Sequence, residues 1–209
     1  MARDACQDGY LDPPIELPHG ILFGSRGQAD SSGPRAAYSR MDLHTYRFHS
    51  TWQVDAAPGD VYEALRVVGD YPAWWPQVCR ADWVGDGTYD LVVRSLLPYN
   101  LRFRSTRSRE DPTGQVLEAA LSGDLEGFSR WTVTASGGGT LLVFDEEVVA
   151  RKALLRRLAV VARPALVANH AVMMRAGCRG LRAHLAGRRS GGFHRHPRNL
   201  PGVRCGRAA

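Results

Sequence analysis

The sequence predicts an α+β fold, in which a curved antiparallel sheet of seven strands wraps around a long C-terminal helix. Three observations support this. An alternating strand begins near residue 45, two short helices follow it, and six turn-punctuated strands precede a long apolar helix that ends near residue 186. A curved sheet that holds a helix leaves space between the two, and such a space is a usual place for a ligand.

The first expected strand covers residues 45–54. Hydrophobic and polar side chains alternate along it, as a half-buried antiparallel strand requires. Its inward side chains are expected to be Tyr46, Phe48, Trp52 and Val54.

Two short helices are expected next. Pro58 supplies a helical φ at the start of the first, and hydrophobic residues recur at helical spacing until Gly69. Asp70 can cap a second helix over residues 71–75, which Pro76 ends.

Six further strands follow, and each gap between them contains residues that favour turns. The gaps contain Gly85-Asp86-Gly87, Pro98-Tyr99-Asn100, Asp111-Pro112-Thr113-Gly114, Gly123-Asp124 and Gly137-Gly138-Gly139. Short links make successive strands neighbours, so the sheet is an antiparallel meander. One face collects Leu91, Val93, Leu101, Phe103, Leu117, Ala119, Leu121, Trp131 and Val133. The opposite face collects Asp90, Arg94, Arg102, Arg104, Glu118 and Arg130.

Residues 153–186 predict a long helix that Pro164 opens or kinks. Beyond Pro164, one stripe at helical spacing is mostly apolar and is expected to face the sheet. The stripe consists of Leu166, His170, Met173, Met174, Gly177, Leu181 and Leu185. Gly177 and Gly180 would let this helix approach a strand closely.

The two ends of the chain are expected to be disordered. Residues 1–40 are rich in proline and glycine and show no sustained period. Met41 directly precedes the first strand, so we hypothesise that translation starts there instead of at Met1. The tail, residues 188–209, carries six arginines and no acid. It offers weak contact with an anionic surface, but no aromatic platform accompanies it, so no nucleic-acid partner is expected.

Composition favours one folded unit. The chain has 209 residues, of which 44% are hydrophobic, enough to bury a core. No secretory leader pattern or membrane span is evident, and the cysteines lack CxxC spacing, so we expect a reduced protein in the cytoplasm.

The cysteines are Cys6, Cys79, Cys178 and Cys205, and nothing nearby in sequence would activate Cys79 or Cys178 as a nucleophile. His194 and His196 are too few for a metal site, so neither a metal nor a cofactor is expected.

Three segments carry a resemblance to a known family. They are VYEALRVVGDYPAWWPQV after the first strand, SGDLEGFSRWTV in the sheet and NHAVMMRAGCRGLRAHL in the last helix. With the order of elements, they make residues 43–187 resemble the SRPBCC superfamily, and more narrowly its bacterial polyketide cyclase/dehydrase branch. The resemblance implies a helix-grip (START-like) fold with a deep, apolar pocket between the sheet and the last helix. In relatives this pocket binds lipids, polyketides, sterols or aromatic compounds, often without a cofactor.

Ten residues are expected to contact a ligand in this pocket. They are Phe48, Trp52, Trp75, Leu91, Phe103, Trp131, Phe144, Glu146, His170 and Met174. The Trp74-Trp75 pair could instead form a lid over the pocket mouth or a plug in the core. Trp52 and Trp131 would supply flat apolar surface, as core or as pocket wall.

His170 and Glu146 are the candidate catalytic residues. His170 is the titratable side chain on the apolar helix stripe, where it could orient or deprotonate a bound phenol or β-keto group. A lone helix histidine can also bind a neighbouring carbonyl or sit at the rim. Alternation puts Glu146 on the side of Leu142, Phe144 and Val148, inside the pocket if these residues line it. The strand could also twist at its end so that Glu146 reaches solvent, and a bulge would exchange the two faces.

The sequence therefore predicts a protein that encloses a hydrophobic small molecule, which is polyketide-like, lipid-like or aromatic. Two other functions remain open: a cyclase or aromatase that uses the same pocket, and a regulator that binds a partner. The chain has no GxSxG, P-loop, HExxH or GxGxxG signature, which argues against the enzyme classes that those motifs mark.

Overall fold

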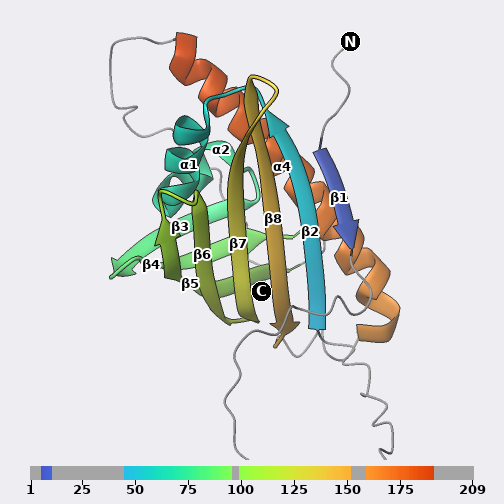
Figure 1. The fold of residues 1–209 in the computed structure, drawn as a ribbon. Helices are drawn as coiled ribbons and strands as arrows, with labels where there is room; N and C mark the ends of the chain where they lie inside the picture. Colours follow the sequence, from blue (N-terminus) through green and yellow to red (C-terminus); the bar gives the residue numbers. More distant parts are fainter. Residues whose placement is uncertain (1–5, 11–44, 96–98, 152–158, 191–209) are drawn as a thin grey trace, which may run out of the picture.

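The protein forms one antiparallel sheet of eight strands, in the order β1-β2-β8-β7-β6-β5-β4-β3, with α4 packed against its inner face (Figure 1). The computed structural model describes residues 6–10, 45–95, 99–151 and 159–190. The elements in chain order are β1 (Cys6–Tyr10), β2 (Thr45–Val54), α1 (Pro58–Arg66), the 3₁₀ turn η1 (Val68–Asp70), α2 (Tyr71–Trp74), β3 (Val78–Gly85), β4 (Thr88–Arg94), β5 (Asn100–Asp111), β6 (Val116–Gly123), β7 (Leu125–Ser136), β8 (Gly139–Ala150) and α4 (Ala159–Ser190). The fold is the helix-grip fold that the sequence predicted.

The seven expected strands are confirmed as β2 to β8, and β1 adds an eighth. β1 comes from the segment that we expected to be disordered, but Cys6–Tyr10 pair antiparallel with β2. A strand at this position covers backbone groups that the edge of β2 would otherwise expose. The rest of the N-terminal segment, and the expected disordered tail, lie outside the described residues.

The inner face of the sheet is hydrophobic because the hydrophobic residues that alternate with polar ones along the strands point inward. In β2, Tyr46, Phe48, Trp52 and Val54 are all buried, as predicted. β8 pairs continuously with β2 on one side and with β7 on the other, without a register shift. The inner and outer side chains of β8 therefore stay on their own faces along its whole length.

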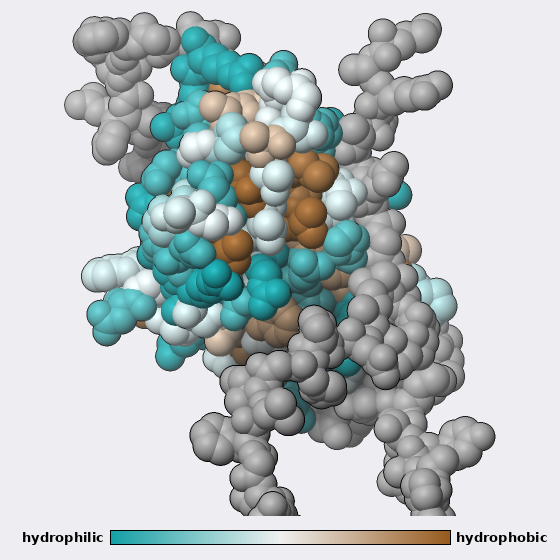
Figure 2. Space-filling model, in the orientation of Figure 1, coloured by the Kyte–Doolittle hydropathy of each residue, from teal (hydrophilic) through white to brown (hydrophobic). Residues whose placement is uncertain are grey.

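Charged side chains pair across strands on the outer face. Arg104 contacts Asp90 at 2.8 Å, Arg130 contacts Glu118 at 2.6 Å, and Arg47 contacts Glu147 at 3.0 Å. Figure 2 shows this face of the molecule as largely hydrophilic, with a few hydrophobic patches near its upper middle. Because water reaches these pairs, although Glu118 is half-buried, they contribute mainly to the register and solubility of the sheet.

The two short helices form a plug at one end of the sheet. Pro58 begins α1 as predicted, whereas Asp70 takes the N-cap position of α2 without a capping hydrogen bond from its side chain. Trp74 and Trp75 are 4% and 8% exposed, so they belong to the core and do not form a lid. The hydroxyl of Tyr71 donates to the carbonyl of Leu65 at 2.7 Å and ties α2 to α1.

α4 runs through Pro164 and ends at Ser190, four residues later than expected. The residues expected to begin the helix, 153–158, lie outside the described residues. The predicted stripe faces the protein interior, and Leu166, Met174, Leu181 and Leu185 are buried on it. Gly177 and Gly180 allow close approach as predicted, but their neighbours are Trp75 and Trp74 of the plug and not a strand. No helix in the described part of the chain is long and apolar enough to cross a membrane.

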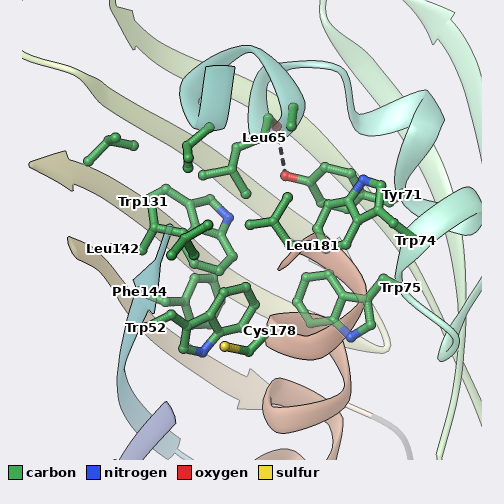
Figure 3. Packing of buried hydrophobic residues seen from close by; sticks show 14 of the residues in the cluster. Trp52, Leu65, Tyr71, Trp74, Trp75, Trp131, Leu142, Phe144, Cys178 and Leu181 are labelled. Carbon is green, nitrogen blue, oxygen red and sulfur yellow. Dashed lines mark hydrogen bonds between the residues drawn. The ribbon is translucent and has the colours of Figure 1, made fainter. Parts of the chain in front are cut away.

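The core has two hydrophobic clusters. The larger one packs Trp52, Trp131, Leu142 and Phe144 of the sheet against the plug and α4, as Figure 3 shows. The smaller one gathers around Tyr46, Phe48, Tyr99, Leu121, Val148, Ala150 and Leu166.

Cys79 and Cys178 are both disulfide-bonded, so the expectation of reduced thiols is wrong for these two residues. Sequence spacing could not predict this, because pairing depends on which Cα atoms the fold brings within about 7 Å. Neither sulfur is available as a nucleophile in this state.

Candidate functional site

A cavity of about 210 Å³ lies between the inner face of the sheet and α4. Side chains from both hydrophobic clusters line it, including Phe48, Leu91, Phe144 and Met174. Its wall is mostly apolar, with a small number of polar side chains, as is usual for small-molecule sites.

The structure brings nine of the ten expected ligand-contacting residues to the cavity wall. The exception is Trp52, which is fully buried in the larger cluster. Its ring packs edge-on against Trp131 at 4.9 Å and against Trp75 at 5.9 Å, measured between ring centroids. Trp52 therefore supports two wall residues from behind.

His170 and Glu146 meet on the cavity wall. Nε2 of His170 lies 3.2 Å from Oε2 of Glu146, and their side chains are 16% and 12% exposed. His170 comes from the apolar stripe of α4, and Glu146 from the inner face of β8. The pair places an imidazole and a carboxylate, two groups that can exchange protons with a ligand, inside an apolar chamber.

Neighbouring rings hold His170 in place. The imidazole stacks on Phe48 with 3.7 Å between ring centroids and an interplanar angle of 10°. Phe48 is also the residue directly opposite Glu146 in the pairing of β2 with β8. Phe48 therefore packs against the ring of His170 from β2, the strand that pairs with the Glu146 strand β8.

The two competing interpretations of Glu146 are wrong. The strand does not carry Glu146 into solvent, and no bulge exchanges the faces of β8, since its register with both neighbours is unbroken. Glu146 lies between Phe48 on β2 and Ser129 on β7, and all three residues line the cavity.

Sequence reasoning missed Arg107, which lines the cavity at the end nearest α1. Its guanidinium donates to the carbonyl of Arg66 at 3.1 Å and pairs with Glu110. Alternation from Leu101 through Phe103 and Ser105 leads inward to Arg107, so the signal was present. The register shift between Arg107 and Arg109 ends that alternation.

A further group of polar residues was also missed. The hydroxyl of Ser95 donates to Oδ1 of Asn169 at 3.1 Å, and Nδ2 of Asn169 lies 3.2 Å from the sulfur of Met173. Tyr46 and Tyr99 also line the cavity. Burial raises the pKa of Tyr46, with a smaller contribution from Tyr99, and burial also raises the pKa of Tyr99.

Among the described residues, no group of three or more histidine, cysteine, aspartate or glutamate side chains could hold a metal ion.

A curved antiparallel sheet that grips a helix, with an apolar cavity between the two, defines a helix-grip protein of the SRPBCC type. Within that class, the chain belongs to the family described as polyketide cyclase / dehydrase and lipid transport, whose sequence profile matches residues 45–186.

Solved structures with a similar fold include enzymes and a START protein. The Zhui aromatase/cyclase from Streptomyces sp. R1128 is 21% identical, with a TM-score of 0.60 over 72% of this chain and 100% of that one. A START superfamily protein from Mycobacterium smegmatis is 14% identical, with a TM-score of 0.56 over 68% of this chain and 97% of that one. The di-domain ARO/CYC BexL from the BE-7585A biosynthetic pathway is 19% identical, with a TM-score of 0.55 over 68% of this chain and 50% of that one. At these identities the likeness shows the fold alone. No curated protein matches the sequence.

Proposed function

We propose that the protein binds a hydrophobic small molecule in the cavity between the sheet and α4, with His170 and Glu146 orienting a polar group of that molecule. The observation that carries the proposal is the apolar cavity of about 210 Å³ with the His170–Glu146 pair on its wall. Lipid-like, polyketide-like and aromatic molecules all have the required combination of apolar body and polar group.

The volume favours a compact ligand. A cavity of about 150 Å³ holds one benzene ring in another protein, so about 210 Å³ suits a bicyclic ring or a short chain. Burying about 150–250 Å² of apolar surface contributes about 4–6 kcal/mol before the costs of association. Contacts with the polar residues must supply the remaining affinity and the orientation.

A pair of neighbouring alanines offers a direct test. Ala119 lines the cavity, whereas Ala120, the next residue along β6, is exposed on the other face. We expect the bicyclic probe 2-naphthol to bind the wild-type protein, as followed by tryptophan fluorescence. Ala119→Phe should weaken this binding by about tenfold or more by filling the cavity, and Ala120→Phe should leave it unchanged. Circular dichroism would check that both variants are folded. Equal binding by all three proteins, or no binding by the wild type, would contradict the proposal.

A second candidate function is enzymatic, and the position of the His170–Glu146 pair inside the cavity favours it. The structurally similar Zhui protein is an aromatase/cyclase, and folding a poly-β-keto chain into a ring requires proton transfers that an imidazole and a carboxylate can make. The two functions differ in the response to His170→Ala and Glu146→Gln. A carrier has no turnover to lose, so both substitutions change only its ligand affinity, whereas an enzyme loses turnover in both variants while they still bind. Native mass spectrometry of freshly purified protein would identify a molecule for this comparison.

A further inference from the structure

Ser129 brings an unused hydroxyl group to the cavity wall. It lies on the inner face of β7, between β6 and β8, and it lines the cavity. The residue is half-buried, and because a strand flanks it on each side, its remaining surface faces the cavity. Its side chain makes no hydrogen bond with the described residues. The unpaired oxygens that are closed off from any solvent belong to other residues, such as Tyr46 and Ser50. The Ser129 hydroxyl is therefore open to a partner inside the cavity.

Two other polar side chains on the wall already have partners in the protein. Asn169 accepts a hydrogen bond from Ser95. Arg107 donates to the carbonyl of Arg66. A polar group that is already bonded gains less from a ligand, because it must give up one bond to make another. Ser129 has no such bond to give up.

Ser129 is the direct neighbour of Glu146 in the sheet. The two residues are paired between β7 and β8, and both line the cavity. Directly paired residues of an antiparallel sheet have their Cβ atoms about 4.5–5.5 Å apart. On its other side, Ser129 is paired with Ala119 of β6, whose small side chain also lines the cavity and leaves room beside the serine. A ligand oxygen placed here can reach both Ser129 and Glu146.

The chemistry of this position favours a ligand hydroxyl. Oε2 of Glu146 lies 3.2 Å from Nε2 of His170, and its side chain makes no other polar contact among the described residues. A hydroxyl group both donates and accepts, so it can accept from Ser129 and donate to Glu146. A carbonyl or ether oxygen only accepts, so it can use the serine but not a carboxylate.

We infer that Ser129 is a third ligand-orienting residue, which with Glu146 selects a bound molecule that carries a hydroxyl group, a phenol or an alcohol. The inference rests on the proposed function and narrows its ligand class. The hydroxyl of the ligand accepts a hydrogen bond from Ser129, and its apolar body fills the rest of the cavity. An apolar molecule of the same shape makes the same wall contacts but leaves the serine unpaired.

The test compares two probes of nearly equal shape, 2-naphthol and 2-methylnaphthalene, by titration of tryptophan fluorescence. Ser129→Ala should weaken 2-naphthol binding by about fivefold to tenfold and change 2-methylnaphthalene binding by less than about twofold. The control is Ser105→Ala. Ser105 lines the same cavity, but it lies on β5, which β6 and β7 separate from the Glu146 strand β8. This control should change each affinity by less than about twofold.

The possible failures can be told apart. If the wild type binds neither probe, the proposed function is wrong and the inference falls with it. If the wild type binds 2-methylnaphthalene but not 2-naphthol, or if Ser129→Ala changes both affinities equally or not at all, only the inference is wrong. An equally selective effect of Ser105→Ala would also overturn it.

The ligand-free melting temperature adds a separate check on Ser129→Ala. Removing a hydroxyl that has no partner in the protein should leave this temperature unchanged or higher. A fall of several degrees would show that the hydroxyl serves the fold, and this would overturn the inference.

Discussion

His170 and Glu146 meet at 3.2 Å although 23 residues of sequence and a change from strand to helix separate them. Strand alternation turns Glu146 inward, and the helical stripe turns His170 toward it. Both side chains are mostly removed from water. Two independent periodicities therefore combine to place an imidazole and a carboxyl group in contact on an apolar wall.

The pair should be coupled more strongly than an exposed pair. Glu146→Gln and His170→Ala should each lower the free energy of unfolding by about 1–3 kcal/mol, because each leaves a charged or polar partner without compensation. In a double-mutant cycle measured by urea unfolding, the coupling should be at least about 1 kcal/mol.

The control for this cycle is His49 and Asp145 on the outer face. Nδ1 of His49 lies 2.7 Å from the carboxylate of Asp145, with side chains 37% and 39% exposed. Their coupling should stay below about 1 kcal/mol, since water screens an exposed pair. Equal couplings for the two pairs would show that burial in the cavity wall adds nothing.

Gly180 should be intolerant of substitution, because a Cβ there would collide with the carbonyl oxygen of Trp74. Gly180→Ala should cost about 1–3 kcal/mol of stability by pushing α4 away from α2. Gly187 on the same helix has nothing within 4 Å of such a Cβ, so Gly187→Ala should stabilise the protein by about 0.5–1 kcal/mol through helix propensity. Thermal unfolding of both variants checks this, and destabilisation of similar size in both would refute the close-approach argument.

The sheet and the long helix could be predicted because their patterns are local. Alternation placed Glu146 on the inner face, and helical spacing placed His170 on the buried stripe. Whether Glu146 stayed inside or twisted out to solvent depended on how far β8 remains paired with β2 and β7. That pairing involves residues distant in sequence, so β8 alone could not decide between the two outcomes.

Other features depended on contacts that sequence patterns do not record. β1 is a five-residue strand, too short to show a period in the sequence. It is recognised as a strand because it pairs with β2. Alternation along β5 points Arg107 inward, but the register shift that ends this alternation after Arg107 depends on pairing with β6. Trp52 and Trp75 looked equivalent as aromatic candidates, and only the packing shows that Trp75 lines the cavity while Trp52 lies behind it.

The two adjacent tryptophans of the plug should differ in their tolerance of phenylalanine. Nε1 of Trp75 donates to the carbonyl of Met173 at 3.1 Å, whereas Nε1 of Trp74 is buried without a partner among the described residues. Both substitutions remove the same atoms from the core, but only Trp75→Phe breaks a hydrogen bond. Trp75→Phe should therefore cost about 1 kcal/mol more than Trp74→Phe in chemical unfolding. The reverse order would mean that the bond between α2 and α4 does not stabilise the plug.

Because its hydroxyl is buried, Tyr71 should make the free energy of unfolding fall as the pH rises above about 10. Its hydroxyl is buried against the carbonyl of Leu65 (Figure 3), and burial raises its pKa above the ordinary value of 10.0. The folded state therefore keeps this proton when the unfolded state releases it. The resulting stabilisation is complete below about pH 10 and is lost as the pH rises above that value. Each retained proton steepens the fall by up to about 1.4 kcal/mol per pH unit.

Tyr71→Phe should flatten this fall between about pH 10 and 11.5, although it lowers stability at neutral pH by about 1 kcal/mol through loss of the bond to Leu65. The chain contains a single lysine, so few other side chains titrate in this window. Burial also raises the pKa of Tyr46, Tyr62 and Tyr99, so part of the slope should remain. Guanidinium unfolding at a series of pH values measures the slope in both proteins. If the two slopes are the same, the buried phenol of Tyr71 does not govern the alkaline limit of the fold.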